Sequence, residues 1–270
     1  MSEFSNLKQV IKEVFESKQV EKAGSEIETT ISLLDQGKIR VCEKKEDTWQ
    51  VNEWVKKSIL LYFQLKKSTV ISIGEDFSYF DKIPLKQWTG NEGVRVVPQA
   101  LVRQGSYVAS NTVLMPSYIN IGAYVDSGSL IDTWATVGSC AQVGKNVHVS
   151  GGVGLGGVLE PLQAQPVIIE DNVFIGSRCI IVEGVQVKKG AVLGAGVVIT
   201  KSSKIIDVTS KEEKVFTGIV PENSVVIPGT RKKQFPSGEY SIPCSLIIGK
   251  RSSSTDLKTS LNSVLRDIPV

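Results

Sequence analysis

Several residue types that build common active sites are scarce in this chain of 270 residues. It holds a single histidine, His148, so one imidazole is available as a base or a metal ligand. Its four cysteines lie far apart, at Cys42, Cys140, Cys179 and Cys244, and form neither a Cys-x-x-Cys pair nor a Cys/His metal pattern. We therefore expect reduced, structural thiols in a cytoplasmic protein and no metal site.

Strong net charge and long apolar runs are lacking as well. The formal net charge is only +3, and no basic block is interleaved with aromatic residues, so the composition does not favour nucleic acid as a partner. No stretch approaches the about 18 apolar residues that a membrane span needs, and the N-terminus has no charged-then-apolar export signal. Hydrophobic residues make up 41% of the chain, enough for a proper core.

What the chain does have is an aliphatic or aromatic residue at every sixth position. The first series is Leu101, Tyr107, Val113, Ile119, Val125, Ile131, Val137, Val143, Val149 and Leu155. The second series is Ile169, Ile175, Ile181, Val187, Leu193, Ile199 and Ile205. A period of six fits neither a helix nor a simple alternating strand, and chance spacing in a β-sandwich does not account for series this long. It is typical of a parallel β-helix of hexapeptide repeats, in which three repeats complete one turn of a triangular prism.

The two series are separated by fourteen residues, from Leu155 to Ile169, where the repeat allows six or twelve. We interpret residues 156–166 as a loop expelled from the prism, either a mobile lid at a binding face or an inert insertion. Residues 1–92 show helical spacing and predict a small mixed domain, and 93–206 form the β-helix. Residues 207–270 predict a C-terminal β/α cap that ends in a helix over Asp256–Arg266.

A triangular prism has flat walls, so we expect a cleft only where two prisms pack side by side, with a homotrimer as the simplest closed arrangement. His148 is a candidate base because it occupies an outward position beside a glycine-rich segment. Asp126 and Asp132 share one repeat position, so spacing alone does not separate a catalytic carboxylate from a solvated one. The pattern supports an acyl- or nucleotidyltransferase and gives no substrate.

Specific motifs go further than the repeat. The most specific reads DTWATVGSCAQVGKNVH at 132–148; others are RVVPQALVRQGSYVA at 95–109, SLLDQGKIRV at 32–41, YFDKIP at 79–84 and IIEDNVFIG at 168–176. Together they resemble the tetrahydrodipicolinate N-succinyltransferase family, succinyl-CoA-dependent enzymes of bacterial lysine and diaminopimelate biosynthesis. The resemblance covers most of the chain and weakens after about residue 200.

The resemblance implies left-handed β-helices in a homotrimer with active sites between subunits. The family's substrate-binding arginine falls on Arg95, within GVRVVP, and its key aspartate falls on Asp132, within IDTW. A family glutamate after Gly-x-Arg falls on Ile180 here, so that acid is missing. Glu183 is the nearest acid, and we do not transfer the role to it.

The implied reaction transfers the succinyl group of succinyl-CoA to the amine of hydrated, ring-opened tetrahydrodipicolinate, with no bound cofactor and no metal. A guanidinium at Arg95 suits the substrate carboxylates, and Asp132 suits a proton acceptor. Backbone N–H groups near 194–196 or 151–157 are candidates for stabilising the oxyanion. Gly194, Ala195 and Lys201 are candidate contacts for CoA.

Alternatives remain open at this stage. A related hexapeptide acetyltransferase with another acceptor would share all but the substrate contacts, and a non-catalytic β-helix binding protein would have no need of Arg95 and Asp132. The general base is either Asp132 or His148.

Overall fold

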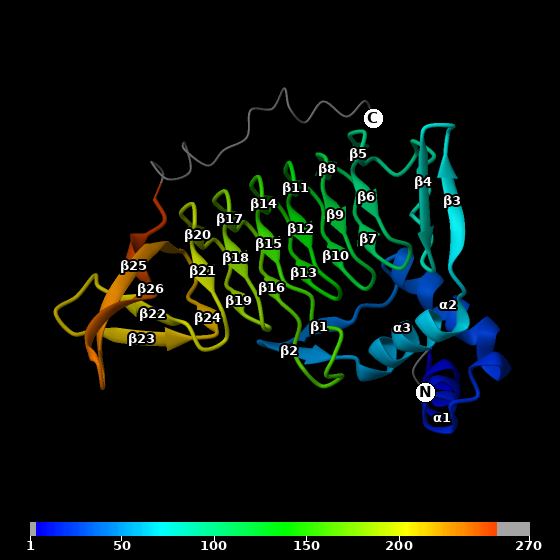
Figure 1. Ribbon diagram of the computed structural model, residues 1–270, viewed down its shortest axis with the longest axis horizontal. Coiled ribbons are helices and arrows are strands. Elements are labelled where there is room, and N and C mark those ends of the chain that lie inside the picture. The colour runs from blue at the N-terminus through cyan, green and yellow to red at the C-terminus, as the bar shows by residue number, and fades with distance from the viewer. Residues whose placement is uncertain (1–3, 253–270) are drawn as a thin grey trace.

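The computed structural model describes residues 4–252, so the helix expected over Asp256–Arg266 lies outside the described residues. The central part of the chain winds into a parallel β-helix whose short strands stack into three walls (Figure 1). Helices lie at the N-terminal end of this prism, and a long β-hairpin lies at the other end.

Each turn of the prism contributes one strand to each wall. The first wall is built from β5 (Arg95–Val96), β8 (Val113–Leu114), β11 (Leu130–Ile131), β14 (His148–Val149), β17 (Phe174–Ile175) and β20 (Val192–Leu193). The second is built from β6 (Leu101–Val102), β9 (Tyr118–Ile119), β12 (Thr136–Val137), β15 (Gly154–Leu155), β18 (Ile180–Ile181) and β21 (Val198–Ile199). The third is built from β7 (Tyr107–Val108), β10 (Tyr124–Val125), β13 (Gln142–Val143), β16 (Ile168–Ile169), β19 (Gln186–Val187) and β24 (Ile219–Val220). We name the three edges of the prism by the walls that they join.

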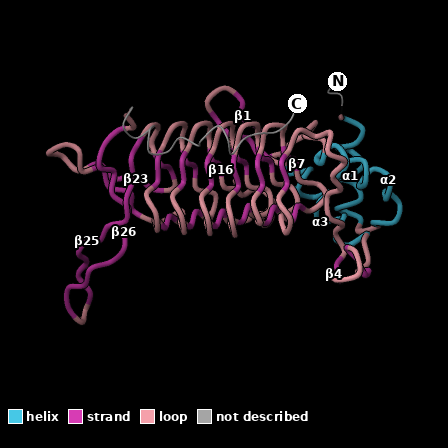
Figure 2. The backbone as a smooth tube through the Cα atoms, turned by 90° about the horizontal axis from the view of Figure 1, so that it is seen from above, coloured by secondary structure: helices cyan, strands magenta, loops and turns pink. Residues whose placement is uncertain are grey.

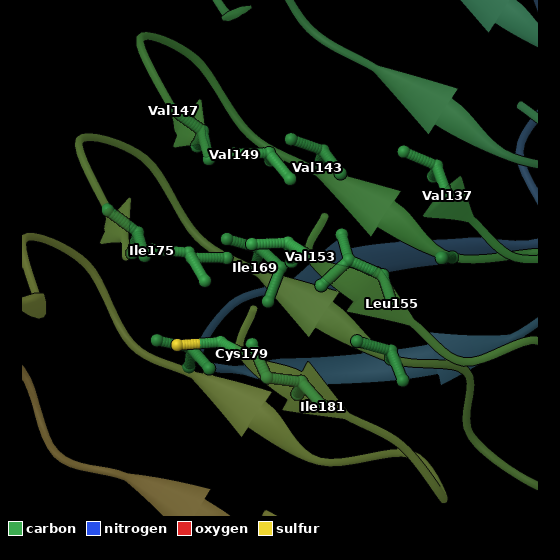
Figure 3. Packing of buried hydrophobic residues seen from close by; sticks show 14 of the residues in the cluster. Val137, Val143, Val147, Val149, Val153, Leu155, Ile169, Ile175, Cys179 and Ile181 are labelled. Atoms are coloured by element: carbon green, nitrogen blue, oxygen red, sulfur yellow. The ribbon is translucent and has the colours of Figure 1, made fainter. Parts of the chain in front are cut away.

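The six-residue period produces this prism because successive side chains of a strand point to opposite faces. The second residue of each strand points inward, and these residues form one continuous core of valine, leucine and isoleucine side chains. Figure 3 shows Val137, Val149 and Leu155 among the side chains that fill the interior of the prism. A smaller residue such as Cys179, which is fully buried, fills the interior beside the turns. The predicted fold class is confirmed.

The first three positions of the predicted series are displaced by one residue. Leu101 pairs with Tyr118 as an outward residue, and its neighbour Val102 points inward and is 2% exposed. The same holds for the other two strands of this coil of the prism, where Val108 and Leu114 face the core. The cause is the connection between β8 and β9, which is one residue shorter than the later connections between strands. A one-residue shift exchanges the inward and outward faces of a strand.

The C-terminal end departs from the simple repeat. After β21 the chain forms an antiparallel pair, β22 (Lys204–Asp207) and β23 (Lys214–Thr217), before β24 resumes the third wall beside β19. The start of β25 (Ser224–Phe235) then extends the first wall beside β20, and β25 turns back as β26 (Gly238–Lys250). The far part of this hairpin projects away from the prism (Figure 2). The prism stacking therefore continues beyond residue 206, after an excursion of one hairpin.

The N-terminal part is helical with two small hairpins. Its elements are α1 (Ser5–Ser17), η1 (Val20–Ala23), α2 (Gly24–Asp35), β1 (Cys42–Lys45), β2 (Thr48–Val51), α3 (Glu53–Leu65), β3 (Thr69–Ile73) and β4 (Phe77–Asp81). The helices bury the apolar residues whose spacing predicts them, for example Ile11 and Ile27. The β3–β4 hairpin carries several exposed apolar residues, including Phe80 at 73% exposure.

The N-terminal part covers the third wall, and within residues 4–252 it leaves the other two walls open along most of their length. The guanidinium of Arg40 lies 3.6 Å from the ring centre of Tyr124 on the outer face of β10, and its Nε donates to Gln142 Oε1 at 3.0 Å. Gly37 adopts a positive φ of 71°, and a side chain there would come within 2.8 Å of the Tyr107 ring. The segment between α2 and β1 therefore closes one face of the prism, whereas the edge between the first and second walls carries exposed residues such as Trp134.

Candidate active site

The edge between the first and second walls gathers most of the residues that the sequence singles out. Consecutive turns on this edge follow β11, β14, β17 and β20, and they contain Asp132, Gly151, Arg178 and Gly194. Arg95 lies on the outer face of β5, two strands before β11 in the same wall. The structure therefore brings the predicted substrate-binding arginine and the predicted catalytic aspartate to one side of the prism.

Asp132 is held by its own turn. Its Oδ1 accepts hydrogen bonds from the Thr133 backbone N–H at 2.6 Å and from the Thr133 hydroxyl at 3.2 Å. Its Oδ2 lies 3.9 Å from the position that a Cβ on Gly151 would occupy, so it faces the neighbouring turn. One carboxylate oxygen is thus fixed, and the other is directed toward the space over Gly151.

Asp126 makes the same local bond, accepting from the Ser127 N–H at 2.7 Å. It follows β10 in the third wall, however, and so lies on the edge between the third and first walls. There it lines a pocket with Arg40, Lys145 and Glu170. Two aspartates that the repeat makes equivalent are therefore placed on different edges of the prism.

The rival base, His148, lies on the strand adjacent to that of Asp132. It is half-buried on the outer face of β14, where it pairs with Leu130 on one side and Phe174 on the other. Its ring centre is 4.8 Å from that of Phe174, with the planes tilted by 54°. Both candidate bases are thus on the open side of the first wall.

Backbone amides on this edge divide into two groups. Those of Gly152, Gly194 and Gly196 donate to carbonyls of the neighbouring turns at 2.7–3.0 Å and are committed to the stacking of the prism. Those of Gly151 and Ala195 make no hydrogen bond with any residue between 4 and 252. The sequence predicts oxyanion donors near 194–196 and 151–157. Of the amides in those segments that lie on this edge, only those of Gly151 and Ala195 are therefore available to donate a hydrogen bond to a ligand.

The predicted CoA contacts fall on two edges. Gly194 and Ala195 lie on the same edge as Asp132, whereas Lys201 follows β21 on the edge between the second and third walls. The Lys201 backbone N–H donates to Glu183 Oε2 at 3.1 Å. Lys201 and Glu183 line a cavity of about 640 Å³ together with the loop 156–166.

The expelled loop is anchored on the N-terminal part. The ammonium of Lys56, a fully buried residue of α3, donates to the Ala164 carbonyl at 2.6 Å. The Val158 N–H donates to the Ser139 carbonyl at 3.1 Å, and Leu159 packs against the helical core. Burial lowers the pKa of Lys56 from its usual value. The loop therefore forms one wall of the cavity and rests on α3.

Ile180 lies between Gly154 and Val198 on the outer face of the second wall and is 39% exposed. Glu183 stands on the next edge, so it does not occupy the place that the family's glutamate would have. The second wall presents an apolar strip beside the candidate site.

Sequence reasoning missed a cluster on the edge between the third and first walls. Glu170, 8% exposed, accepts from the Trp49 indole at 3.0 Å and from the ammonium groups of Lys44 and Lys188 at 3.2 Å each. Burial raises the pKa of Glu170, but the Trp49 hydrogen bond and the charge and hydrogen bond of Lys188 outweigh it, so the net pKa is lowered. The cluster fastens the β1–β2 hairpin to the prism. The only sign of this cluster in the sequence is the acidic residue Glu170, which directly follows the repeat residue Ile169.

Within residues 4–252, no three His, Cys, Asp or Glu side chains gather in a way that could hold a metal ion. The four cysteines are free and buried, and burial raises the pKa of Cys140 to about 12. In the same part of the chain, no helix has the length and apolar character needed to cross a membrane.

Comparisons with known proteins agree with these features. A family model described as the N-terminal part of tetrahydrodipicolinate N-succinyltransferase matches residues 6–65, and one described as a hexapeptide repeat of succinyl-transferase matches 166–201. A relative from Cupriavidus metallidurans, named 2,3,4,5-tetrahydropyridine-2,6-dicarboxylate N-succinyltransferase, is 53% identical over 89% of both chains. Proteins with the same name from a Psychrobacter species (49% identity over 97% of this chain and 99% of that protein) and from Klebsiella pneumoniae (53% over 90% and 89%) are similar.

Proposed function

This chain belongs to the tetrahydrodipicolinate N-succinyltransferase family, and from that premise we propose how its residues carry out the reaction. It is a CoA-dependent N-acyltransferase that moves the succinyl group of succinyl-CoA to the amine of hydrated, ring-opened tetrahydrodipicolinate. The products are N-succinyl-2-amino-6-oxopimelate and CoA, in the succinylase route to diaminopimelate and lysine. The reaction takes place in the cytoplasm, where reduced thiols such as these four persist.

The chemistry takes place at the edge between the first and second walls. The acceptor amine attacks the thioester carbonyl carbon, and Asp132 accepts the proton that the amine loses. The Oδ1 of Asp132 is fixed by Thr133, so Oδ2 is the basic atom. As the C–S bond breaks, the proton passes to the leaving thiolate, and CoA departs as the thiol.

Negative charge develops on the thioester oxygen during the attack. The Gly151 N–H donates a hydrogen bond to this oxygen. That amide has no hydrogen-bond acceptor within residues 4–252 and lies beside Asp132. Loss of one such donor typically lowers the rate by about 100- to 1000-fold. The proposal rests mainly on one observation: the Asp132 carboxylate, with Oδ2 facing the neighbouring turn, lies beside the Gly151 N–H, which has no acceptor within residues 4–252.

Arg95 holds a carboxylate of the acceptor. It is exposed on the outer face of the first wall, on the N-terminal side of Asp132. A guanidinium binds a carboxylate through two parallel hydrogen bonds, which orients as well as attracts the substrate. The acceptor therefore approaches Asp132 from the side of the N-terminal helices.

CoA lies toward the other end of the prism. The Ala195 N–H on the edge of Asp132 and the cavity beside Lys201 mark the two ends of a path over the second wall. The path crosses the apolar strip of Ile180 and Val198, which suits the pantetheine arm, and Lys201 supplies positive charge for a phosphate.

The open walls support a homotrimer with each site completed by a neighbouring subunit. Trp134, Ile180 and Val198 are 67%, 39% and 52% exposed around this edge, and apolar side chains gathered in this way favour a subunit interface. Light scattering should give about three times the chain mass of 29.3 kDa. An active monomer would overturn the shared-site part of the proposal.

The test of function is thiol release. The purified protein should release CoA from succinyl-CoA only when tetrahydrodipicolinate is present, and should do so more slowly from acetyl-CoA. A preference for acetyl-CoA would favour the acetyltransferase alternative. The absence of thiol release from both donors would favour a non-catalytic binding protein.

A further inference from the structure

Arg178 lies beside the proposed site and adopts the left-handed backbone conformation that recurs in the turns of this prism. In the turns of the edge between the first and second walls, the residues with positive φ are Gln99, Trp134, Gly152, Arg178 and Gly196, after β5, β11, β14, β17 and β20. Glycine and asparagine adopt this conformation with least strain, and a long side chain there is uncommon. Arg178 has a φ of 61°, and its N–H donates to the Gly151 carbonyl at 3.0 Å. The fold sets this conformation in many of its turns, and what distinguishes Arg178 on this edge is the long charged side chain that it carries there.

The side chain of Arg178 lies across Gly152. A Cβ placed on Gly152 would stand 2.8 Å from Cδ, 2.9 Å from Nε and 3.1 Å from Cζ of Arg178. A larger residue at position 152 would therefore displace the guanidinium. Asp132 Oδ2 is 3.9 Å from the equivalent point on Gly151. The arginine and the proposed base thus border one two-residue platform, Gly151–Gly152.

This guanidinium has no acidic partner within the described residues. No ion pair between residues 4 and 252 includes Arg178, and its side chain is exposed on the open side of the prism. A positive charge set over a glycine beside the reacting groups has the position needed to bind an anionic group of a substrate.

Both substrates carry carboxylates. The places of Arg95 and Arg178 along the prism indicate which substrate each arginine binds. Arg95 lies two strands before β11, and Arg178 lies two strands beyond it. Adjacent strands are about 4.8 Å apart, so each arginine starts about 10 Å from the strand of Asp132, on opposite sides. The acceptor occupies the Arg95 side, and the donor reaches Asp132 from the side of Ala195. The carboxylate nearest to Arg178 is therefore the donor's.

We propose that Arg178 binds the free carboxylate of the succinyl group and so selects succinyl-CoA over uncharged acyl donors. This inference rests on the proposed function, and it assigns donor selectivity to a residue of this chain other than Arg95 and Asp132. Gly152 contributes by leaving space for the side chain.

The test is a binding cycle by calorimetry at low temperature, with succinyl-CoA, its neutral amide analogue succinamoyl-CoA, and acetyl-CoA. The unmodified protein should bind succinyl-CoA about 10- to 100-fold more tightly than succinamoyl-CoA, as expected of one hydrogen bond between charged groups. Arg178→Asn should bind the two within about threefold of each other. Asparagine tolerates positive φ, so this variant should melt no lower than the unmodified protein. Lys145→Asn removes an exposed charge on another edge and should leave the preference unchanged.

Three results would overturn the inference. Arg178→Asn could keep the preference for succinyl-CoA, or weaken all three donors equally, which would indicate general attraction of CoA phosphates. It could also raise the KM for tetrahydrodipicolinate while donor preference stays constant, which would assign Arg178 to the acceptor. If the unmodified protein binds succinyl-CoA selectively through Arg178 but releases no thiol with tetrahydrodipicolinate, the proposed function fails and the inference stands.

Discussion

Replacing Glu170 should loosen the N-terminal part from the prism by an amount that follows from its contacts. Glu170→Ala leaves the Trp49 indole N–H and the Lys189 backbone N–H without the acceptor that now lies at 3.0 and 3.2 Å. Each orphaned donor costs about 1–3 kcal/mol. Lys44 and Lys188 have side chains that are 43% and 24% exposed, so they can reach water, and their ion pairs add only about 0–1 kcal/mol each. Together these losses amount to roughly 2–8 kcal/mol.

Urea unfolding followed by tryptophan fluorescence and by circular dichroism measures this loss. Glu28→Gln is the matched control, because its ion pair with Lys66 has a glutamate side chain that is 54% exposed and should contribute less than about 1 kcal/mol. If Glu170→Ala and Glu28→Gln lower the free energy of unfolding equally, the cluster does not fasten the hairpin.

The same carboxylate predicts a pH dependence. The folded pKa of Glu170 lies below its usual value of 4.5 because the Trp49 and Lys188 contacts outweigh burial. Its contribution to stability is therefore complete above that value and disappears as the pH falls through the folded pKa. The difference in unfolding free energy between the protein and Glu170→Gln should be constant above pH 4.5 and shrink below it. A difference that grows on acidification would contradict the sign.

Two other changes test the packing around the site. Gly176→Ala would bring a Cβ within 2.6 Å of the Ala195 backbone nitrogen. It should therefore lower the free energy of unfolding by roughly 1–3 kcal/mol, measured by thermal unfolding, and distort the edge between the first and second walls. Unchanged stability would show that neighbouring turns move apart without cost. Lys56→Met removes the ammonium that binds the Ala164 carbonyl at 2.6 Å, so amide exchange in residues 156–165 should accelerate; unchanged protection would mean that the loop does not depend on this anchor. Because burial lowers the pKa of Lys56, the unmodified protein should gain stability as the pH rises from the folded pKa toward 10.5, and Lys56→Met should lack that gain.

The sequence predicts the prism well because each hexapeptide carries its own signal. An inward aliphatic residue recurs through turn after turn, so the walls follow from local pattern alone. The signal fails where one turn is shortened, and there Leu101 and Tyr107 face outward instead of inward. It also fails at the C-terminal end, where β24 rejoins the stack after the β22–β23 pair. The shortened turn is hidden because Leu101, Tyr107 and Val113 are apolar like their inward neighbours, so either register fits the six-residue pattern.

The site is less predictable because the repeat makes unlike residues equivalent. Asp126 and Asp132 share a repeat position and the same local hydrogen bond, and only the winding of the chain places them on different edges. Likewise, Lys201 and Ala195 are close in sequence but lie on separate edges. Contacts such as Glu170 with Trp49 join residues far apart in the chain, and spacing carries no information about them.

The most direct test of the account compares three variants in the thiol-release assay with succinyl-CoA and tetrahydrodipicolinate. Asp132→Asn should lower turnover by about 100- to 10,000-fold, the usual effect of losing a general base, while trimer mass and succinyl-CoA binding stay unchanged. Asp126→Asn, with the same local turn on another edge, should retain near-normal turnover, and His148→Gln should retain most of it. Near-normal turnover in Asp132→Asn together with its loss in His148→Gln would contradict the account and assign the base to the histidine.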